Sequence, residues 1–295
     1  MVCKVAVSTN PGRPMQIERP DFVGDAIHIA PNGLHVGHYG PYRLYSAYQP
    51  IYAECAGSNP QLAAFEGLIR PRFDGQDVRP AEFFAGVIRR DHLFVERMCR
   101  ALHLRNYKHV RPSGKTTFFN VDAARYGSMW DLEHSYRYFI DRFEEHGMAR
   151  GNVVVEILES KPTEPGMLEW LRDFSRDQNI KIAIDDFGQL HSDLDRYYLL
   201  QPDIVKIDCL LFQEGYREPA VRKLLASTIE RFHGNGSIVL IEGIESASQL
   251  DAALAMGADL IQGFLLARPS VLPHAFDVAE PRPAMADAEL ARQSA

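Results

Sequence analysis

The stretch Ile182-Ala183-Ile184-Asp185-Asp186-Phe187-Gly188 is an apolar run that ends in two adjacent carboxylates, an aromatic residue and a glycine. Such a run is typical of a buried strand whose last residues leave the core and face solvent or a ligand. The neighbouring aspartates repel each other, so the pair is stable where it is well hydrated or where it holds a metal ion. For one such pair alone, a solvated turn is the simpler interpretation.

Three more short β-branched runs carry charged residues at or near their carboxyl ends, at residues 153–159, 204–208 and 238–245. Four unrelated solvated turns in one half of the chain do not explain this recurrence well. The recurrence favours a set of parallel strands whose ends share one role.

Strands and helices alternate along the rest of the chain. Further strands are predicted at residues 44–53, 62–69, 116–121 and 260–264, and helices at 80–104, 131–146, 165–178, 194–200, 219–232 and 247–256. This alternation predicts the α/β class and a closed (β/α)8 TIM-like barrel. An open doubly wound sheet is the alternative, but no G-x-G-x-x-G sequence follows the first strand.

Composition excludes several classes of protein. The formal net charge of −7 argues against general affinity for DNA, RNA or an anionic membrane. No apolar stretch is long enough to span a bilayer, and we expect no secretory signal in the first residues, because their apolar run is short and soon interrupted. The four cysteines lie far apart, so we expect free thiols in a cytoplasmic protein. We expect residues 1–40 to form an N-terminal extension, 41–270 the barrel domain and 271–295 a tail.

In a barrel the carboxyl ends of the strands converge on one face, where the active site lies. Five carboxylates and an amide in one cleft need cations, and their oxygen atoms suit Mg²⁺ or Mn²⁺. Two ions that share a bridging aspartate suit in-line displacement at phosphorus, with Lys206 holding the attacking water and Glu242 accepting its proton. The residues that converge in this way are Glu66, Asn120, Glu156, Asp185, Asp186, Lys206, Glu242 and Gln262.

These motifs resemble the EAL-domain family of cyclic di-GMP phosphodiesterases, over roughly residues 44 to 270 and in the family's order. The segment Glu66-Gly67-Leu68-Ile69-Arg70 stands where the family has its Glu-Ala-Leu-x-Arg signature. The other matching motifs are Tyr48-Gln49-Pro50-Ile51, Phe119-Asn120-Val121, Glu156-Ile157-Leu158-Glu159, Asp185-Asp186-Phe187-Gly188, Val205-Lys206-Ile207-Asp208, Glu242-Gly243-Ile244-Glu245 and Gln262-Gly263-Phe264.

The resemblance implies a barrel whose first strand is antiparallel to the rest, and hydrolysis of cyclic di-GMP to linear pGpG by a metal-activated water. It implies a homodimer to which the helix at 194–200 contributes. It assigns Glu66, Asn120, Glu156 and Asp185 to a first metal ion, with Asp185 bridging to a second ion completed by Asp186. It assigns Lys206 and Glu242 to the water, Gln49, Leu68, Arg70 and Gln262 to the substrate, and Glu159 to anchoring the loop after Asp186. Glu245 and Asp208 are possible outer residues of the site. The alternative for Glu159 and Glu245 is a loop salt bridge or a helix cap, and for Asp208 a capping role at the strand end.

The chain departs from the family at Gly67, at Leu158 and in the loop 189–193, where Gln-Leu-His-Ser-Asp replaces Thr-Gly-Tyr-Ser-Ser. The altered loop predicts a weaker second metal site, and it keeps open a catalytically weak or inactive module that binds cyclic di-GMP. A third hypothesis treats Lys206 as the Schiff-base lysine of an aldolase. The surrounding carboxylates favour metal ions over that chemistry.

Overall fold

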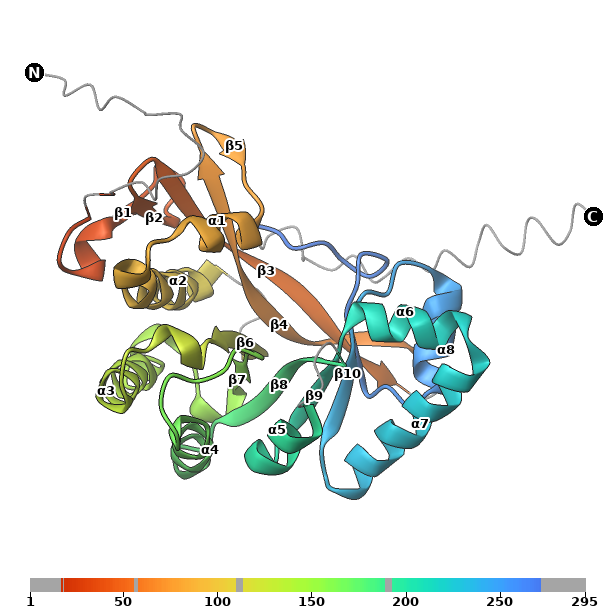
Figure 1. Ribbon diagram of the computed structural model, residues 1–295. Helices are drawn as coiled ribbons and strands as arrows, with labels where there is room; N and C mark the ends of the chain where they lie inside the picture. Colours follow the sequence, from red (N-terminus) through yellow and green to blue (C-terminus); the bar gives the residue numbers. More distant parts are fainter. Residues whose placement is uncertain (1–16, 18, 56–57, 110–113, 189–192, 272–295) are drawn as a thin grey trace, which may run out of the picture.

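The computed structural model describes Ile17 and residues 19–55, 58–109, 114–188 and 193–271. Its central feature is a closed barrel of eight strands (Figure 1). Seven strands form the series β11-β10-β9-β8-β7-β6-β4, and β3 closes the barrel because it pairs with both β11 and β4. β3 is antiparallel to both neighbours, whereas the remaining barrel strands pair in parallel. The predicted barrel and its antiparallel first strand are therefore confirmed. The barrel strands are β3 (Tyr42–Cys55), β4 (Ser58–Phe73), β6 (Thr116–Val121), β7 (Val153–Ile157), β8 (Lys181–Phe187), β9 (Ile204–Ile207), β10 (Ile238–Ile241) and β11 (Leu260–Ile261).

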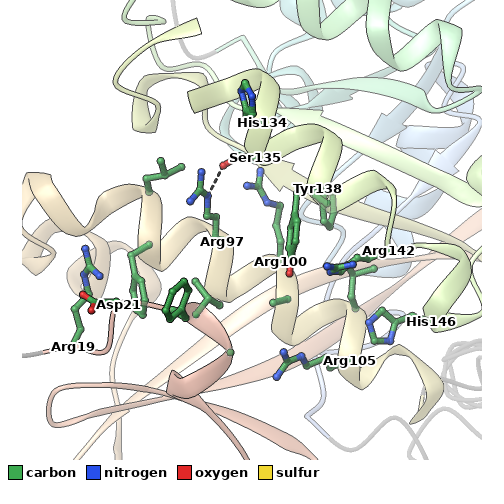
Figure 2. Close-up of a pocket in the computed structure, with 18 of the residues that line it drawn as sticks. Arg19, Asp21, Arg97, Arg100, Arg105, His134, Ser135, Tyr138, Arg142 and His146 are labelled. Atoms are coloured by element: carbon green, nitrogen blue, oxygen red, sulfur yellow. Dashed lines mark hydrogen bonds between the residues drawn. The ribbon is translucent and has the colours of Figure 1, made fainter. Parts of the chain in front are cut away.

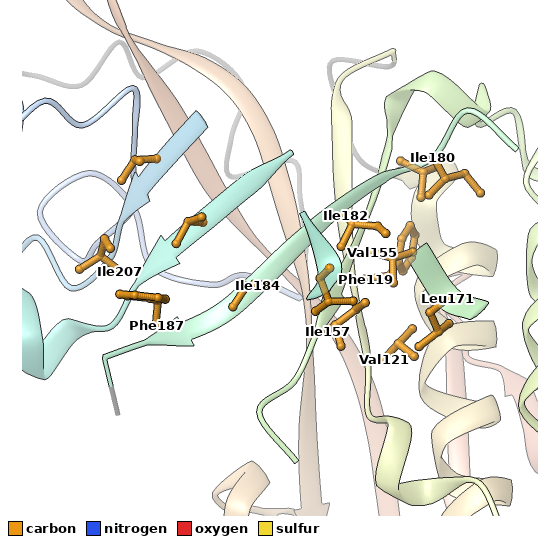
Figure 3. Close-up of a cluster of buried hydrophobic side chains, with 14 of the residues drawn as sticks. Phe119, Val121, Val155, Ile157, Leu171, Ile180, Ile182, Ile184, Phe187 and Ile207 are labelled. Carbon is orange, nitrogen blue, oxygen red and sulfur yellow. The ribbon is translucent and has the colours of Figure 1, made fainter. Parts of the chain in front are cut away.

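Helices surround the barrel (Figure 1), and their apolar faces pack on the outward-facing residues of the strands. Figure 3 shows part of this outer layer, where Phe119, Val155 and Ile182 from three neighbouring strands lie close to Leu171 of α4. The helices are α1 (Pro80–Gly86), α2 (His92–Asn106), α3 (Met129–Ile140), α4 (Met167–Asp177), α5 (Asp193–Leu200), α6 (Cys209–Arg217), α7 (Pro219–Gly234) and α8 (Ala247–Ala255). Among the residues described, no helix is both long and apolar enough to cross a membrane.

Two predicted helices are shorter than expected. The single helix predicted at 80–104 is two helices, because Val87 and Ile88 are extended and a 3-10 turn over Arg89–Asp91 follows. The buried carboxylate of Asp91 in this turn accepts hydrogen bonds from Arg19 and Tyr39, so tertiary contacts set the break. The helix predicted at 131–146 ends at Ile140 and is followed by turns.

Two elements near the carboxyl end differ from the prediction. The sequence reading missed α6, which begins at Cys209 directly after β9. The last strand was predicted to continue to Phe264, but β11 ends at Ile261. A Cβ atom on Gly263 would lie 2.0 Å from the carbonyl oxygen of Ile244. The chain therefore passes directly against the Ile244 backbone at this glycine and leaves the sheet.

The described part of the first 40 residues extends the barrel sheet. The strand β2 (His35–Tyr39) pairs with β3, and β1 (Ile27–Ile29) pairs with β2. The short β5 (Gln76–Asp77) pairs with the end of β4. A second apolar cluster joins this sheet edge to α1 and α2. The division of the chain at residues 40 and 270 stays a prediction.

Candidate active site

The interior of the barrel has an apolar layer with a polar layer above it. Side chains alternate across a strand, so residues two positions apart share a face. The apolar layer takes one residue from each strand: Ile51, Ala64, Phe118, Val154, Ala183, Ile204, Leu240 and the partly buried Leu260. The positions two residues from these, on the side of the barrel where the parallel strands end, form what we call the polar layer: Gln49 from the antiparallel β3, and Glu66, Asn120, Glu156, Asp185, Lys206, Glu242 and Gln262.

Lys206 lies at the centre of the polar layer, and its side chain is 1% exposed. Its Nζ lies 2.7 Å from Asp185 Oδ1, 2.7 Å from Glu242 Oε1 and 2.8 Å from Glu156 Oε1. Glu66 Oε1 is farther away, at 3.7 Å, and Glu66 Oε2 accepts a hydrogen bond of 2.9 Å from Gln262 Nε2. Four predicted carboxylates thus surround one ammonium group, and Gln262 holds the most distant of them, Glu66.

The electrostatics of this cluster show an excess of negative charge. Burial alone disfavours the charged form of Lys206, but the surrounding carboxylates outweigh it and raise its pKa well above the ordinary value. Burial raises the pKa of Glu242 to about 8 and that of Glu156 well above its usual range, although Lys206 opposes both shifts. One lysine therefore does not offset the cost of burying these carboxylates together.

Asp186 joins the site through a β-bulge. Ile184 pairs with Val205 and Phe187 with Ile207, so β8 has one more residue than β9 over this interval. Asp186 is left-handed, with φ of 54°, and the bulge lets Phe187 return to the outer apolar layer. Burial, followed by the charge of Asp185, raises the pKa of Asp186 to about 6. Both aspartates of the pair are therefore available at the mouth of the barrel.

The donor set fits divalent metal ions. One carboxylate oxygen from each of Asp185, Asp186 and Glu242 lies within 4.8 Å of the others. Glu156 is fully buried, and its Oε2 has no hydrogen-bond partner among the described residues. Glu156 Oε1 and Asp185 Oδ1 contact Lys206 at ion-pair distance but without the angles of a hydrogen bond. Such carboxylate oxygens, together with the amide of Asn120, are the ligands that Mg²⁺ and Mn²⁺ prefer.

The residues predicted to bind substrate lie at the edge of the same layer. The side chain of Gln49 is buried and donates a 3.3 Å hydrogen bond to the carbonyl of Ala267. Leu68 and Arg70 follow Glu66 at two-residue steps along β4, and both are half-buried. Arg70 donates to the carbonyl of Ile69, and burial lowers its pKa.

Gly67 has a structural partner that the sequence reading did not identify. A Cβ atom at this position would lie 3.1 Å from Cγ of His103, whose ring is buried on the outer side of β4. The imidazole also contacts the hydroxyl of Ser46. The backbone carbonyl of His103 accepts a 2.5 Å hydrogen bond from the hydroxyl of Tyr48. The glycine therefore makes room for a fixed histidine without moving Glu66.

Glu159 lies beside a buried arginine. Its Oε1 is 4.0 Å from Nη1 of Arg196 on α5, and Arg196 also donates a 2.7 Å hydrogen bond to the carbonyl of Ile157. Of the loop 189–193 that Glu159 was predicted to anchor, residues 189–192 lie outside the described residues. Sequence reasoning missed Arg196, because one arginine in a short amphipathic helix gives no signal of burial.

The two possible outer residues differ in position. Asp208 caps α6, since its Oδ1 accepts hydrogen bonds from the backbone of Leu210 and Leu211. Glu245 is exposed, and the N-terminus of α8 is capped instead by Ser246 with Gln249 in a capping box. Capping, the alternative considered for both residues, is therefore observed for Asp208.

Most of the chain matches a known protein family. The sequence model of the EAL domain matches residues 42–269. YkuI of Bacillus subtilis, an uncharacterized protein that contains an EAL domain, is 32% identical over 154 residues, which are 52% of this chain and 37% of YkuI. The cyclic di-GMP phosphodiesterase NbdA of Pseudomonas aeruginosa is 26% identical over 241 residues, which are 75% of this chain. This chain spans only 28% of NbdA, so it matches a part of these longer relatives.

Two solved structures with a similar fold contain c-di-GMP. The crystal structure of YkuI in complex with c-di-GMP and calcium has a TM-score of 0.65 and 28% identity, and the match covers 77% of this chain and 56% of that one. A standalone EAL protein from Vibrio cholerae, in its c-di-GMP-bound form, has a TM-score of 0.67 and 20% identity. That match covers 77% of this chain and 92% of the other, and at this identity it supports the fold alone.

Proposed function

We propose that this chain, which belongs to the EAL domain family, hydrolyses cyclic di-GMP to linear pGpG with the help of bound divalent metal ions. The observation that carries this proposal is the polar layer, in which four carboxylates from four strands surround the buried ammonium group of Lys206. An ordinary barrel core has no need of such a cluster, and its energetic cost is expected at functional sites. A Schiff-base aldolase finds less support, because a lysine held charged is a poor nucleophile.

The residues that would hold metal follow from the donor set. Glu66, Asn120 and Glu156 would bind a first Mg²⁺ or Mn²⁺ ion together with Asp185, and Asp186 would complete a second site. Metal bound there would lower the pKa of a water molecule and offset the charge of the phosphodiester.

The other residues would act directly on water and substrate. Lys206 remains protonated, so it would donate hydrogen bonds that orient the attacking oxygen rather than accept its proton. Glu242, 2.7 Å from Nζ on the neighbouring strand, would accept that proton. The guanidinium of Arg70 would bind a substrate phosphate, and Gln49, Leu68 and Gln262 would line the same face.

The test is the conversion of cyclic di-GMP by the purified full chain in the presence of Mg²⁺ or Mn²⁺, with the product identified by chromatography. We expect linear pGpG, and we expect Glu66→Ala to abolish its formation. The exposed residue Glu230 on α7 provides a control, because Glu230→Ala removes the same charge far from the polar layer. No product with either metal would refute hydrolysis. Tight calorimetric binding of the nucleotide without product would instead assign a regulatory binding module.

We also propose that the chain forms a homodimer through α5. Leu194 and Tyr198 on this helix are 44% and 55% exposed, which leaves apolar surface for a second copy to cover. Location in the cytoplasm stays a prediction.

A further inference from the structure

A second site lies between α2, α3 and the segment at residues 19–24. There a cavity of about 520 Å³ is lined by six arginines and two histidines but by only one described carboxylate, that of Asp21. No described residue of its lining belongs to the polar layer. Figure 2 shows Arg97 and Arg100 pointing from α2 toward α3, with Arg105 farther along α2. This concentration of positive charge is unexpected in a chain whose net charge is −7.

Four of the six arginines pair with carboxylates: Arg19 and Arg90 with Asp91, Arg100 with Glu96, and Arg142 with Glu145. The positive charge of the cavity is therefore only partly neutralised. Arg97 donates to the hydroxyl of Ser135, and neither Arg97 nor Arg105 has a carboxylate at ion-pair distance among the described residues. Burial, followed by the charge of Arg100, lowers the pKa of Arg97. The neighbouring guanidinium groups of Arg97 and Arg100 repel each other, so an anion bound between or beside them would be favoured.

Arg100 is the buried member of the group, at 3% exposed. Its guanidinium lies 3.6 Å from Glu96 and donates to the hydroxyl of Tyr126, yet its Nε has no hydrogen-bond partner among the described residues. Leaving a donor on a buried charged group without a hydrogen bond is unfavourable, so a bound ligand is expected to supply the partner.

The rest of the lining is apolar and aromatic. Leu93 and Phe94 contribute from α2, and Phe139 contributes from α3. Both phenylalanine rings are buried, and the guanidinium carbon of Arg19 lies 4.3 Å from the centroid of Phe94. The ring of Tyr138 is 61% exposed, and the guanidinium carbon of Arg142 lies 3.9 Å from its centroid. Flat surfaces of this kind stack on planar groups, so the cavity offers both an anion site and a platform.

We propose that this cavity binds a small organic phosphate, with the phosphate group on Arg97, Arg100 and Arg105 and a planar body against the exposed ring of Tyr138. The arginine fork matches the geometry of phosphate, which accepts paired hydrogen bonds. The volume falls in the range of cavities that hold small molecules. A nucleoside monophosphate is the simplest compound with both parts.

The experiment is calorimetric titration of the full chain with AMP, in excess chelator so that no metal-dependent binding in the polar layer contributes. We expect one AMP per chain, with inorganic phosphate and adenosine each binding at least about tenfold more weakly because each lacks half of the contacts. Raising the salt concentration should weaken AMP binding.

Variants separate this site from the rest of the molecule. Arg97→Gln and Arg105→Gln change half-buried residues, and each should weaken AMP binding about tenfold or more. Arg231→Gln on the exposed face of α7 and Glu66→Ala in the polar layer should leave it unchanged. The proposal is overturned if AMP does not bind, if inorganic phosphate binds as tightly as AMP, or if both cavity variants bind AMP like the unmodified chain.

Discussion

At the scale of single residues, Lys206 and Glu242 occupy neighbouring strands and touch at 2.7 Å. If they act on the attacking water, they contribute to the transition state more than to nucleotide binding. We therefore expect Lys206→Met and Glu242→Gln each to lower kcat by about 100-fold or more, with a much smaller change in Kd for cyclic di-GMP. Steady-state kinetics and calorimetry measure the two quantities. If the affinity for cyclic di-GMP fell by the same factor as kcat, these residues would be assigned to binding and not to the attacking water.

Gly67 and His103 form a pair whose coupling is measurable. Alanine at position 67 would press on the buried imidazole, so Gly67→Ala should destabilise the chain by about 1 kcal/mol. In a His103→Ala background the same change should be neutral or stabilising, because the ring is gone and alanine restricts the unfolded chain more than glycine does. Denaturant unfolding of the four proteins measures this coupling. An identical effect in both backgrounds would contradict the packing described above.

At the scale of elements, the cap at Asp208 connects β9 to α6. Asp208→Ala should destabilise the chain by about 1 kcal/mol, because the first backbone N–H groups of α6 lose their acceptor. Asp208→Asn keeps an acceptor oxygen, so it should retain both stability and turnover. Thermal unfolding and the phosphodiesterase assay measure these effects. An asparagine variant that is stable but inactive would show that the carboxylate acts in the active site.

Most elements could be predicted because their periodicity is local. The β-branched runs before Glu156, Asp185 and Lys206 are strands, and their polar ends meet because parallel barrel strands end on one face. The short α6 was missed because its first residues, Cys209 to Phe212, follow β9 after a single aspartate and read as a continuation of the apolar run. The break near Val87 depends on distant contacts to Asp91, which local periodicity does not report.

The site was predictable in its members but not in its contacts. Spacing along each strand indicated which residues face the barrel interior. The bulge at Asp186 and the buried Arg196 depend on register and packing between separate elements. The arginine cavity was also not predicted, since its residues come from three segments and look like ordinary surface charges in the sequence.

At the scale of the whole molecule, the proposed dimer has a direct test. Leu194→Lys places a charge on the exposed apolar face of α5, so it should shift the chain from dimer to monomer in light scattering. Leu224 on α7 is 69% exposed, and Leu224→Lys provides a matched control that should remain dimeric. A Leu194→Lys variant that stays dimeric would place the interface elsewhere, and an unmodified chain that is monomeric at all concentrations would refute the dimer.

The central claim is that the polar layer of the barrel is a metal-dependent hydrolytic site. The most direct measurement is the rate of pGpG formation by metal-stripped full chain as Mn²⁺ or Mg²⁺ is raised from zero. We predict no measurable rate without metal and a saturable rise with it. Glu156→Gln removes a charge at a buried position where one carboxylate oxygen has no hydrogen-bond partner among the described residues. For this variant we predict that the half-maximal rate of pGpG formation requires at least about tenfold more metal. A rate that is unchanged in excess chelator, or a metal requirement that is the same in both proteins, would contradict the account.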